Sequence, residues 1–209
     1  MNTLLRGAAA ACALFLATGA QAQGSGKADL EAVQRAMHVC AACHGEGGRS
    51  TDARYPSLAG QMRDYTVRQL RDFRSQTRSE SNSQAYMWGI SALLTDEVID
   101  GLADYYAQQT PAPGKVAAGT RKAVLAQGQR LFAAGIPDRG VRACASCHGD
   151  KGEGASAFPR LAGQQAAYVY RQLKGFGTPL RPHGVIMKNE VKALNDAQLR
   201  ALASYVQSL

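Results

Sequence analysis

The sequence "CAACH" at residues 40–44 recurs as "CASCH" at residues 144–148, so the chain contains two copies of one five-residue motif. Two cysteines three positions apart lie on one face of a helix, and the histidine that follows them turns toward the same side. Four thiols and two imidazoles could bind zinc, exchange electrons through disulfides, or attach a group covalently. The sequence around the motifs favours one of these chemistries.

The N-terminus has the pattern of a secretory signal peptide, which we predict to span residues 1–22. It contains Arg6, an apolar run over residues 8–17 and a small-residue exit at residues 20–22. The apolar run is shorter than the roughly 20 residues that a bilayer-spanning helix needs. We therefore expect a mature chain that is exported to the periplasm and begins at Gln23.

Export places the remaining cysteines in an oxidising compartment, where unoccupied Cys-x-x-Cys pairs tend to oxidise. A zinc site made of two such pairs usually has them about 15 to 20 residues apart, and it does not explain the histidine after each pair. A thioredoxin-like motif requires a strand and helix setting that this sequence lacks. Cys-x-x-Cys-His is the attachment pattern of c-type haem, so we predict two covalently attached haem c groups. The predicted attachment thiols and proximal iron ligands are Cys40, Cys43 and His44 in the first copy, and Cys144, Cys147 and His148 in the second.

The two motifs belong to a longer internal repeat. "YPSLAGQMRDYTVRQLRDF" follows the first motif and "FPRLAGQQAAYVYRQLKGF" follows the second, and further on "MWGISALLTDEVIDGLADYY" corresponds to "MKNEVKALNDAQLRALASYV". Between the copies, the Pro and Gly residues of "TPAPGKVAAG" are typical of a linker. We expect a first domain over residues 23–110, a linker over 111–119 and a second domain over 120–209.

Both halves have the sequence pattern of helices, with apolar residues at helical spacing and no alternating strand pattern. Helices are expected from about residue 29 to Cys40, over about residues 123–132, and after each Ala-Gly-Gln run. Thr95 and Asn195 are expected to cap a C-terminal helix in each half. The predicted fold class is all-α, and a covalent haem would complete the core of domains this small.

A signal peptide followed by two Cys-x-x-Cys-His modules, each with a Pro-x-Leu-Ala-Gly-Gln segment and a Met before a C-terminal helix, resembles the cytochrome c4 family of two-haem cytochromes. The resemblance covers essentially the whole mature chain. It implies two tandem class I cytochrome c domains joined by a short linker. It also implies that the two haems approach each other across the domain interface.

Met87 and Met187 are the expected sixth iron ligands, because they lie seven residues before Leu94 and Leu194 in the two copies. A thioether ligand raises the reduction potential relative to a second imidazole. His183, four residues before Met187, is the alternative ligand in the second half.

Five further residues have expected roles around the haems. Pro56 and Pro159 resemble the class I cytochrome proline whose carbonyl accepts a hydrogen bond from the proximal imidazole. Arg78 and Arg181 could reach haem propionates, but solvated side chains are the expectation for both. His38 lies too close to Cys40 to reach the opposite face of a haem, so we expect it at the surface.

These features predict a periplasmic electron-transfer protein that catalyses no reaction of its own, because a six-coordinate iron exchanges electrons without binding a substrate. We expect redox protein partners and no nucleic acid, and the resemblance implies a membrane terminal oxidase such as the cbb3 type as electron acceptor. The formal net charge of +8 becomes +7 without the signal peptide. Four propionates would reduce it to about +3, so the overall charge indicates only a modest preference for acidic partners.

Two other classes of protein share the same motifs. A cytochrome subunit of a larger dehydrogenase, such as a flavocytochrome sulfide dehydrogenase, would leave the substrate chemistry to another chain. A stand-alone enzyme, such as a two-haem peroxidase or a thiosulfate dehydrogenase, would need an open iron position or an unusual ligand. The sequence leaves open the reduction potentials, the donor and acceptor, the oligomeric state and any peripheral association with a membrane.

Overall fold

The computed structural model describes residues 29–209, so the predicted signal peptide lies outside the described residues. The first half contains α1 (Leu30–His44), the 3-10 turn η1 (Glu46–Gly48), α2 (Arg63–Arg74), the π-helical turn η2 (Ser83–Met87), α3 (Trp88–Ala92) and α4 (Asp96–Ala107). The second half contains α5 (Lys122–Ala134), the 3-10 turn η3 (Pro137–Arg139), α6 (Ala145–His148), α7 (Ala166–Phe176), α8 (Val185–Val191) and α9 (Asp196–Ser208). Residues 29–209 contain no strand, only two isolated bridges, which confirms the all-α prediction.

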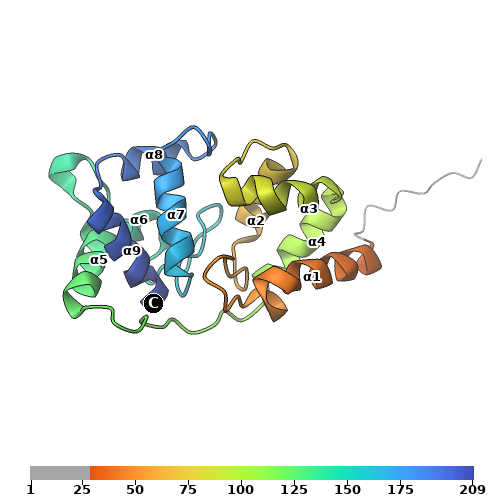
Figure 1. Cartoon of the computed structure of the whole chain (residues 1–209), viewed down its shortest axis with the longest axis horizontal. Helices are drawn as coiled ribbons and strands as arrows, with labels where there is room; N and C mark the ends of the chain where they lie inside the picture. The colour runs from red at the N-terminus through yellow and green to blue at the C-terminus, as the bar shows by residue number, and fades with distance from the viewer. Residues whose placement is uncertain (1–28) are drawn as a thin grey trace, which may run out of the picture.

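The two halves lie side by side, with α1 to α4 in one and α5 to α9 in the other (Figure 1). The segment between α4 and α5 has no helix and runs along one side of both halves (Figure 1). It is held at Lys115, whose backbone N–H donates to the Gln207 carbonyl at 2.9 Å. The Gln207 amide donates back to the Lys115 carbonyl at 3.2 Å, so the connection is fixed against the end of α9.

Local sequence explains where the helices begin. The Asp29 carboxylate accepts from the Glu31 N–H at 3.0 Å and caps α1. The predicted caps of the C-terminal helices are confirmed: Thr95 Oγ1 accepts from the Val98 N–H at 3.3 Å, and Asn195 forms a reciprocal capping box with Gln198.

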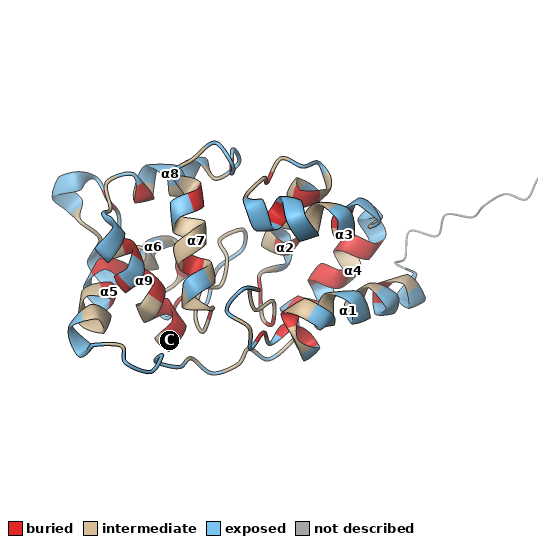
Figure 2. Ribbon diagram, viewed as in Figure 1, coloured by how far each residue is buried: buried red, intermediate tan, exposed pale blue. Residues whose placement is uncertain are grey.

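Each half has its own small core around its C-terminal helix. The first core is formed by Val33, Val98, Leu102 and Tyr106, and the second by Leu131, Phe132, Val169, Leu202, Ala203 and Val206. The buried residues therefore lie on the inner faces of the helices, and the outer faces are exposed (Figure 2). Among residues 29–209, no helix combines the length and apolar character needed to cross a bilayer.

The same backbone hydrogen bonds hold the loop after the Cys-x-x-Cys-His motif in both halves. The Gly48 carbonyl accepts from the Leu58 N–H at 2.7 Å, and the Gly152 carbonyl accepts from the Leu161 N–H at 2.7 Å. Gly48 has a φ of 76°, and a Cβ there would lie 2.9 Å from the backbone nitrogen of Ala59. Glycine is therefore required where this loop passes close to its own chain.

Candidate functional site

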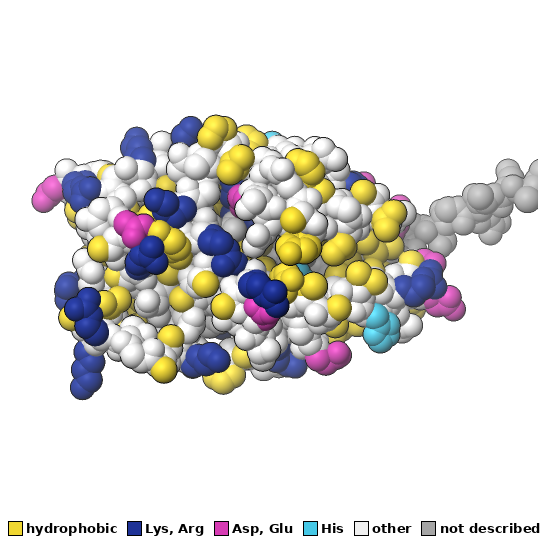
Figure 3. Space-filling model, in the orientation of Figure 1, with side chains coloured by type: hydrophobic (Ala, Val, Ile, Leu, Met, Phe, Trp, Pro, Cys, Tyr) yellow, Lys and Arg dark blue, Asp and Glu magenta, His cyan; other side chains and the backbone are white. Residues whose placement is uncertain are grey.

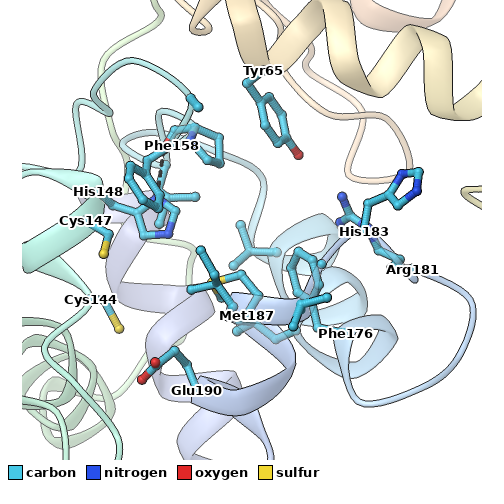
Figure 4. Close-up of a pocket in the computed structure, with 18 of the residues that line it drawn as sticks. Tyr65, Cys144, Cys147, His148, Phe158, Phe176, Arg181, His183, Met187 and Glu190 are labelled. Carbon is cyan, nitrogen blue, oxygen red and sulfur yellow. Dashed lines mark hydrogen bonds between the residues drawn. The ribbon is translucent and has the colours of Figure 1, made fainter.

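A cavity of about 670 Å³ opens in the second half, within the range of about 300–1,000 Å³ typical of cofactor pockets. Its apolar lining includes Phe132, Leu161, Val169, Leu173, Phe176, Leu202 and Val206. Figure 4 shows His148 on one side of this cavity, Met187 across from it, and the thiols of Cys144 and Cys147 along one edge. The structure therefore brings the four predicted haem-binding residues of the second copy into one cavity.

His148 is buried at the C-terminal end of α6 and has a fixed orientation. Its Nδ1 donates to the Pro159 carbonyl at 2.9 Å, as predicted (Figure 4). Burial lowers the pKa of His148 below its usual value, and the hydrogen bond to Pro159 opposes this only in part. The imidazole is therefore neutral near pH 7, and its Nε2 keeps a free lone pair that can bind a metal.

The described cysteines are unpaired, and burial makes two of their thiols, those of Cys40 and Cys144, weaker acids than usual. All four cysteines of residues 29–209 are free and partly buried. Burial raises the pKa of Cys144 to about 11, with a smaller contribution from the Glu190 carboxylate. Burial likewise raises the pKa of Cys40. Cys40 and Cys144 are therefore not the low-pKa thiolates that rapid disulfide exchange requires.

The first half repeats the contact between the histidine and the proline carbonyl. His44 is buried at the end of α1, and its Nδ1 donates to the Pro56 carbonyl at 2.8 Å. Burial is again the main cause that lowers the pKa of His44. Met87 is the last residue of η2 and is half-buried. Each half thus provides one oriented imidazole, two thiols and a methionine before the C-terminal helix.

The donor atoms fit haem c better than zinc. Within residues 29–209, no three His, Cys, Asp or Glu side chains converge in a way that could hold a metal ion. A structural zinc site needs about four such ligands, whereas a haem iron needs one axial residue on each face and an apolar cavity for the ring. In the second half, the His148 imidazole and the Met187 thioether lie on two sides of an apolar cavity. This arrangement matches the requirements of a haem and not those of a zinc site.

The fold and these residues define a c-type cytochrome with two modules. The family model described as cytochrome c matches residues 30–109 and again residues 125–209. The chain belongs to the cytochrome c family and, within it, to the cytochrome c4 group of two-haem proteins. Cytochrome c domains carry covalently bound haem c, and the two Cys-x-x-Cys-His motifs fit two such groups.

Three comparisons support this assignment. Reduced recombinant cytochrome c4 from Pseudomonas stutzeri has a similar structure, with a TM-score of 0.77 and 33% identity over 87% of this chain and 98% of that one. A relative named cytochrome c-552 from Acidithiobacillus ferridurans is 35% identical over 94% of this chain and 85% of its own length. A relative named thiosulfate dehydrogenase electron acceptor from Stutzerimonas stutzeri is 36% identical over 94% of this chain and 91% of its own length.

Arg78 and Arg181 lie at the contact between the halves, so the prediction that they are solvated is wrong. Their exposed fractions are only 5% and 8%. Each guanidinium stacks on an aromatic ring of its own half, Arg78 at 4.5 Å from the centre of Phe73 and Arg181 at 4.2 Å from that of Phe176. Stacking and hydrogen bonds therefore compensate both guanidiniums for the water they lose inside the contact.

Gln69 and Gln172 join the two arginines into one cluster across the interface. The Gln69 side-chain oxygen accepts from Arg78 at 2.8 Å and from Arg181 at 2.7 Å. Gln172 also accepts from both guanidiniums, including that of Arg78 at 2.7 Å. These glutamines belong to the Arg-Gln-Leu triplet that repeats in both halves, and that repetition was the available signal for a shared role.

Glu80 supplies the carboxylate of this cluster. The arginines and glutamines come in pairs, one from each half, but Glu80 has no acidic counterpart in the second half. Its oxygens lie 3.1 Å from Nε of Arg78 and 3.6 Å from Nε of Arg181. Burial alone raises the pKa of Glu80, but the two guanidiniums outweigh it and hold the pKa below its usual value. Both arginines also line the cavity of the second half, so the cluster of two guanidiniums and one carboxylate contributes a net positive charge to its wall.

His183 lies near the far end of the cavity of the second half, away from the position opposite His148 (Figure 4). Its side chain is exposed, and its Nδ1 contacts the Asp72 carboxylate of the first half at 2.8 Å. Met187, and not His183, therefore occupies the side of the cavity across from His148. His38 is exposed on α1, as predicted.

Proposed function

We propose that this chain is a two-haem electron carrier. One haem c would be attached to Cys40 and Cys43 with His44 and Met87 as axial ligands, and the other to Cys144 and Cys147 with His148 and Met187 as axial ligands. The observation that carries the proposal is the repeated geometry in which a buried imidazole donates to the Pro56 or Pro159 carbonyl. A bound haem supplies an iron that changes oxidation state without binding substrate.

The side chains of the protein would control how easily that iron is reduced. The hydrogen bond at Nδ1 fixes the plane and basicity of each imidazole. The thioether of Met87 or Met187 favours the reduced iron, and the apolar lining of the cavity excludes water. No catalytic residue is proposed, because both faces of each haem would be occupied.

The interface between the halves supports electron exchange within one chain. Tyr65 and Arg68 of the first half line the cavity of the second half. The Arg68 guanidinium also donates to the Ala157 carbonyl at 2.5 Å, which ties α2 to the loop beside that cavity. A haem in the second half would therefore reach the contact between the halves, where a short path to the first haem can exist.

We further propose that residues 1–22 are a cleaved signal peptide and that the carrier works in the periplasm. Its domains would span residues 23–110 and 120–209, joined by residues 111–119. A cbb3-type terminal oxidase is the proposed electron acceptor. A second candidate function is acceptance of electrons from a thiosulfate dehydrogenase, because a relative 36% identical over 94% of this chain is named as such an acceptor.

Intact mass spectrometry of the denatured protein tests the attachment chemistry. The expected mass is that of residues 23–209 plus two haem groups. One haem or none would contradict the two-haem proposal, and a start other than Gln23 would contradict the cleavage site. Affinity purification from periplasm separates the partner proposals, because a co-purified dehydrogenase would favour the second function and an oxidase the first.

A further inference from the structure

The two halves share one fold but carry opposite net charge. Residues 29–110 contain 8 Lys and Arg against 11 Asp and Glu, which gives −3. Residues 120–209 contain 13 Lys and Arg against 5 Asp and Glu, which gives +8. On the face shown in Figure 3, Lys and Arg side chains are more frequent over the second half, at left. The modest charge of the whole chain therefore conceals a strongly basic end.

The basic half also exposes apolar side chains at the mouth of its cavity. Val185 and Ile186 are 61% and 50% exposed, and both line that mouth together with Arg142. Lys188 and Lys192 are exposed on and just after the same helix, α8, one turn apart. We call these five residues the α8 surface.

The acidic residue nearest to the α8 surface is largely neutralised. The Glu190 side chain is only 18% exposed and pairs with Arg142 at 2.6 Å. The outward charge of the surface thus comes mainly from Lys188 and Lys192. An apolar centre beside charged residues is the usual anatomy of a transient protein interface.

The corresponding surface of the first half lacks these cations. Because Met87 corresponds to Met187, Trp88 and Ala92 occupy the positions of Lys188 and Lys192. Counting from the first cysteine of each motif, His38 occupies the position of Arg142. At these three aligned positions, therefore, only the second half carries arginine or lysine.

We propose that the α8 surface is the docking site for an acidic redox protein, so that electrons pass to or from that partner through the second half. This inference rests on the proposed carrier function and adds which end meets an acidic partner. The basic end has a polypeptide charge of +8, which two haem propionates would reduce to about +6, and it steers an acidic protein toward itself over distances at which the acidic first half repels it. Val185 and Ile186 then exclude water at the contact beside the proposed haem.

Stopped-flow oxidation of the fully reduced two-haem protein by plant plastocyanin tests the proposal. Plastocyanin is a small blue-copper protein with an acidic surface patch, and one electron passes from haem iron to Cu(II) in each productive encounter. Rates are compared at ionic strengths of about 0.01 M and 0.15 M, where the screening length falls from about 30 Å to about 8 Å. We expect the bimolecular rate constant to be about tenfold higher at the lower ionic strength.

Lys192→Glu and Lys188→Glu should each lower the low-salt rate constant at least about threefold, and high salt should remove most of the difference. Lys122→Glu is the matched control, because it makes the same charge change where α5 begins, on the opposite side of the second half from α8 (Figure 1). Redox titration of each variant checks that the driving force is unchanged. Lys188 is adjacent to Met187 in the chain, whereas Lys192 is five residues away. If Lys188→Glu disturbs the haem site, Lys192→Glu still tests the proposal.

Equal slowing by Lys122→Glu, or a rate constant independent of salt, would overturn the docking proposal. The carrier function would still stand if ferricyanide, a small oxidant, oxidised both haems rapidly and reversibly. Failure of ferricyanide to oxidise either haem reversibly would instead overturn the carrier function itself.

Discussion

Gln164 of the second half and Ser57 of the first exchange two hydrogen bonds across the interface. The Ser57 N–H donates to the Gln164 side-chain oxygen at 2.8 Å, and the Gln164 amide donates to the Ser57 carbonyl at 2.9 Å. Gln61 makes the matching pair with the backbone of Arg160, at 2.8 and 3.1 Å. The glutamine of each Ala-Gly-Gln run therefore binds the segment beside the proline of the other half, and the repeat motif itself joins the two domains.

Replacing Gln164 with alanine removes both hydrogen bonds to Ser57 and leaves two partly buried backbone groups without these partners. We expect the free energy of unfolding to fall by about 1–3 kcal/mol, at about 0.5–1.5 kcal/mol for each bond. Guanidinium-induced unfolding of the haem-loaded protein measures this change. Gln34→Ala, on the exposed face of α1, is the control and should change stability by less than about 0.5 kcal/mol. If Gln164→Ala and Gln34→Ala changed the free energy of unfolding equally, the hydrogen bonds between Gln164 and Ser57 would contribute nothing to stability.

The interface should weaken in acid through Glu80. A carboxyl whose folded pKa lies below its unfolded value of 4.5 stabilises the fold above that value, and the contribution is lost as pH falls through the folded pKa. We therefore expect the temperature midpoint of unfolding to drop, as the pH falls below about 4.5, more steeply in the natural chain than in Glu80→Gln. Glu80→Gln should also be less stable at pH 7, because Arg78 and Arg181 then lack a buried counter-charge.

Thermal unfolding monitored by circular dichroism over that pH range measures the effect. Glu46→Gln, an exposed substitution in η1, is the control and should keep the pH dependence of the natural chain. Parallel pH profiles for Glu80→Gln and the natural chain would refute the role given to Glu80.

Much of the fold could be predicted from the sequence because the deciding signals are local. Helix caps such as Thr95 and Asn195 depend on residues three positions away, and periodic apolar residues such as Leu102 and Leu202 mark the buried faces. The hydrogen bonds from His44 and His148 to prolines 12 and 11 residues later were predictable from the family pattern.

The interface was not predictable in the same way. An arginine is normally solvated, and its burial depends on partners distant in sequence, here Gln69 with Arg181 and Gln172 with Arg78. Glu80 has no acidic counterpart in the second half, where His183 occupies the same place after the repeated arginine. Repetition singled out Arg78 and Arg181, but only the packing of the halves shows what they contact.

The crossing of α5 and α9 depends on the absence of a side chain at Gly128. A Cβ at this position would lie 2.2 Å from the carbonyl oxygen of Ala201 and 2.6 Å from Cβ of Tyr205. We expect Gly128→Ala to destabilise the second half by about 1–3 kcal/mol, because the helices must move apart. Gly89→Ala in α3 is the control, since a Cβ there meets nothing within 4 Å, and it should be neutral or stabilise by up to about 1 kcal/mol. Urea unfolding measures both variants, and a stabilised Gly128→Ala would refute the close crossing.

The methionine ligands are tested by exchanging the thioether for an imidazole. We expect Met187→His to lower the potential of one haem and Met87→His that of the other, because an imidazole favours the oxidised iron more than a thioether does. Spectroelectrochemical titration resolves the two transitions. Met62→Leu is the control, because Met62 is half-buried where α2 begins and is not a proposed ligand. Two unchanged transitions in either histidine variant would leave that methionine with a packing role only.

Carbon monoxide distinguishes a carrier from an enzyme that reacts at iron. If Met87 and Met187 occupy the sixth positions, an added ligand must first break an iron–sulfur bond inside a packed domain, whereas an enzyme acting at iron needs that position open. We therefore expect the visible spectrum of the reduced protein to change little under carbon monoxide at neutral pH, and the oxidised protein to show no appreciable peroxide turnover. Met187→Ala is the positive control, because it should open one iron and give rapid stoichiometric binding. Rapid binding by the natural chain at one haem would refute the carrier assignment for that half. If only the second haem bound carbon monoxide, His183 would become the residue to replace next, because it lies at the end of the same cavity.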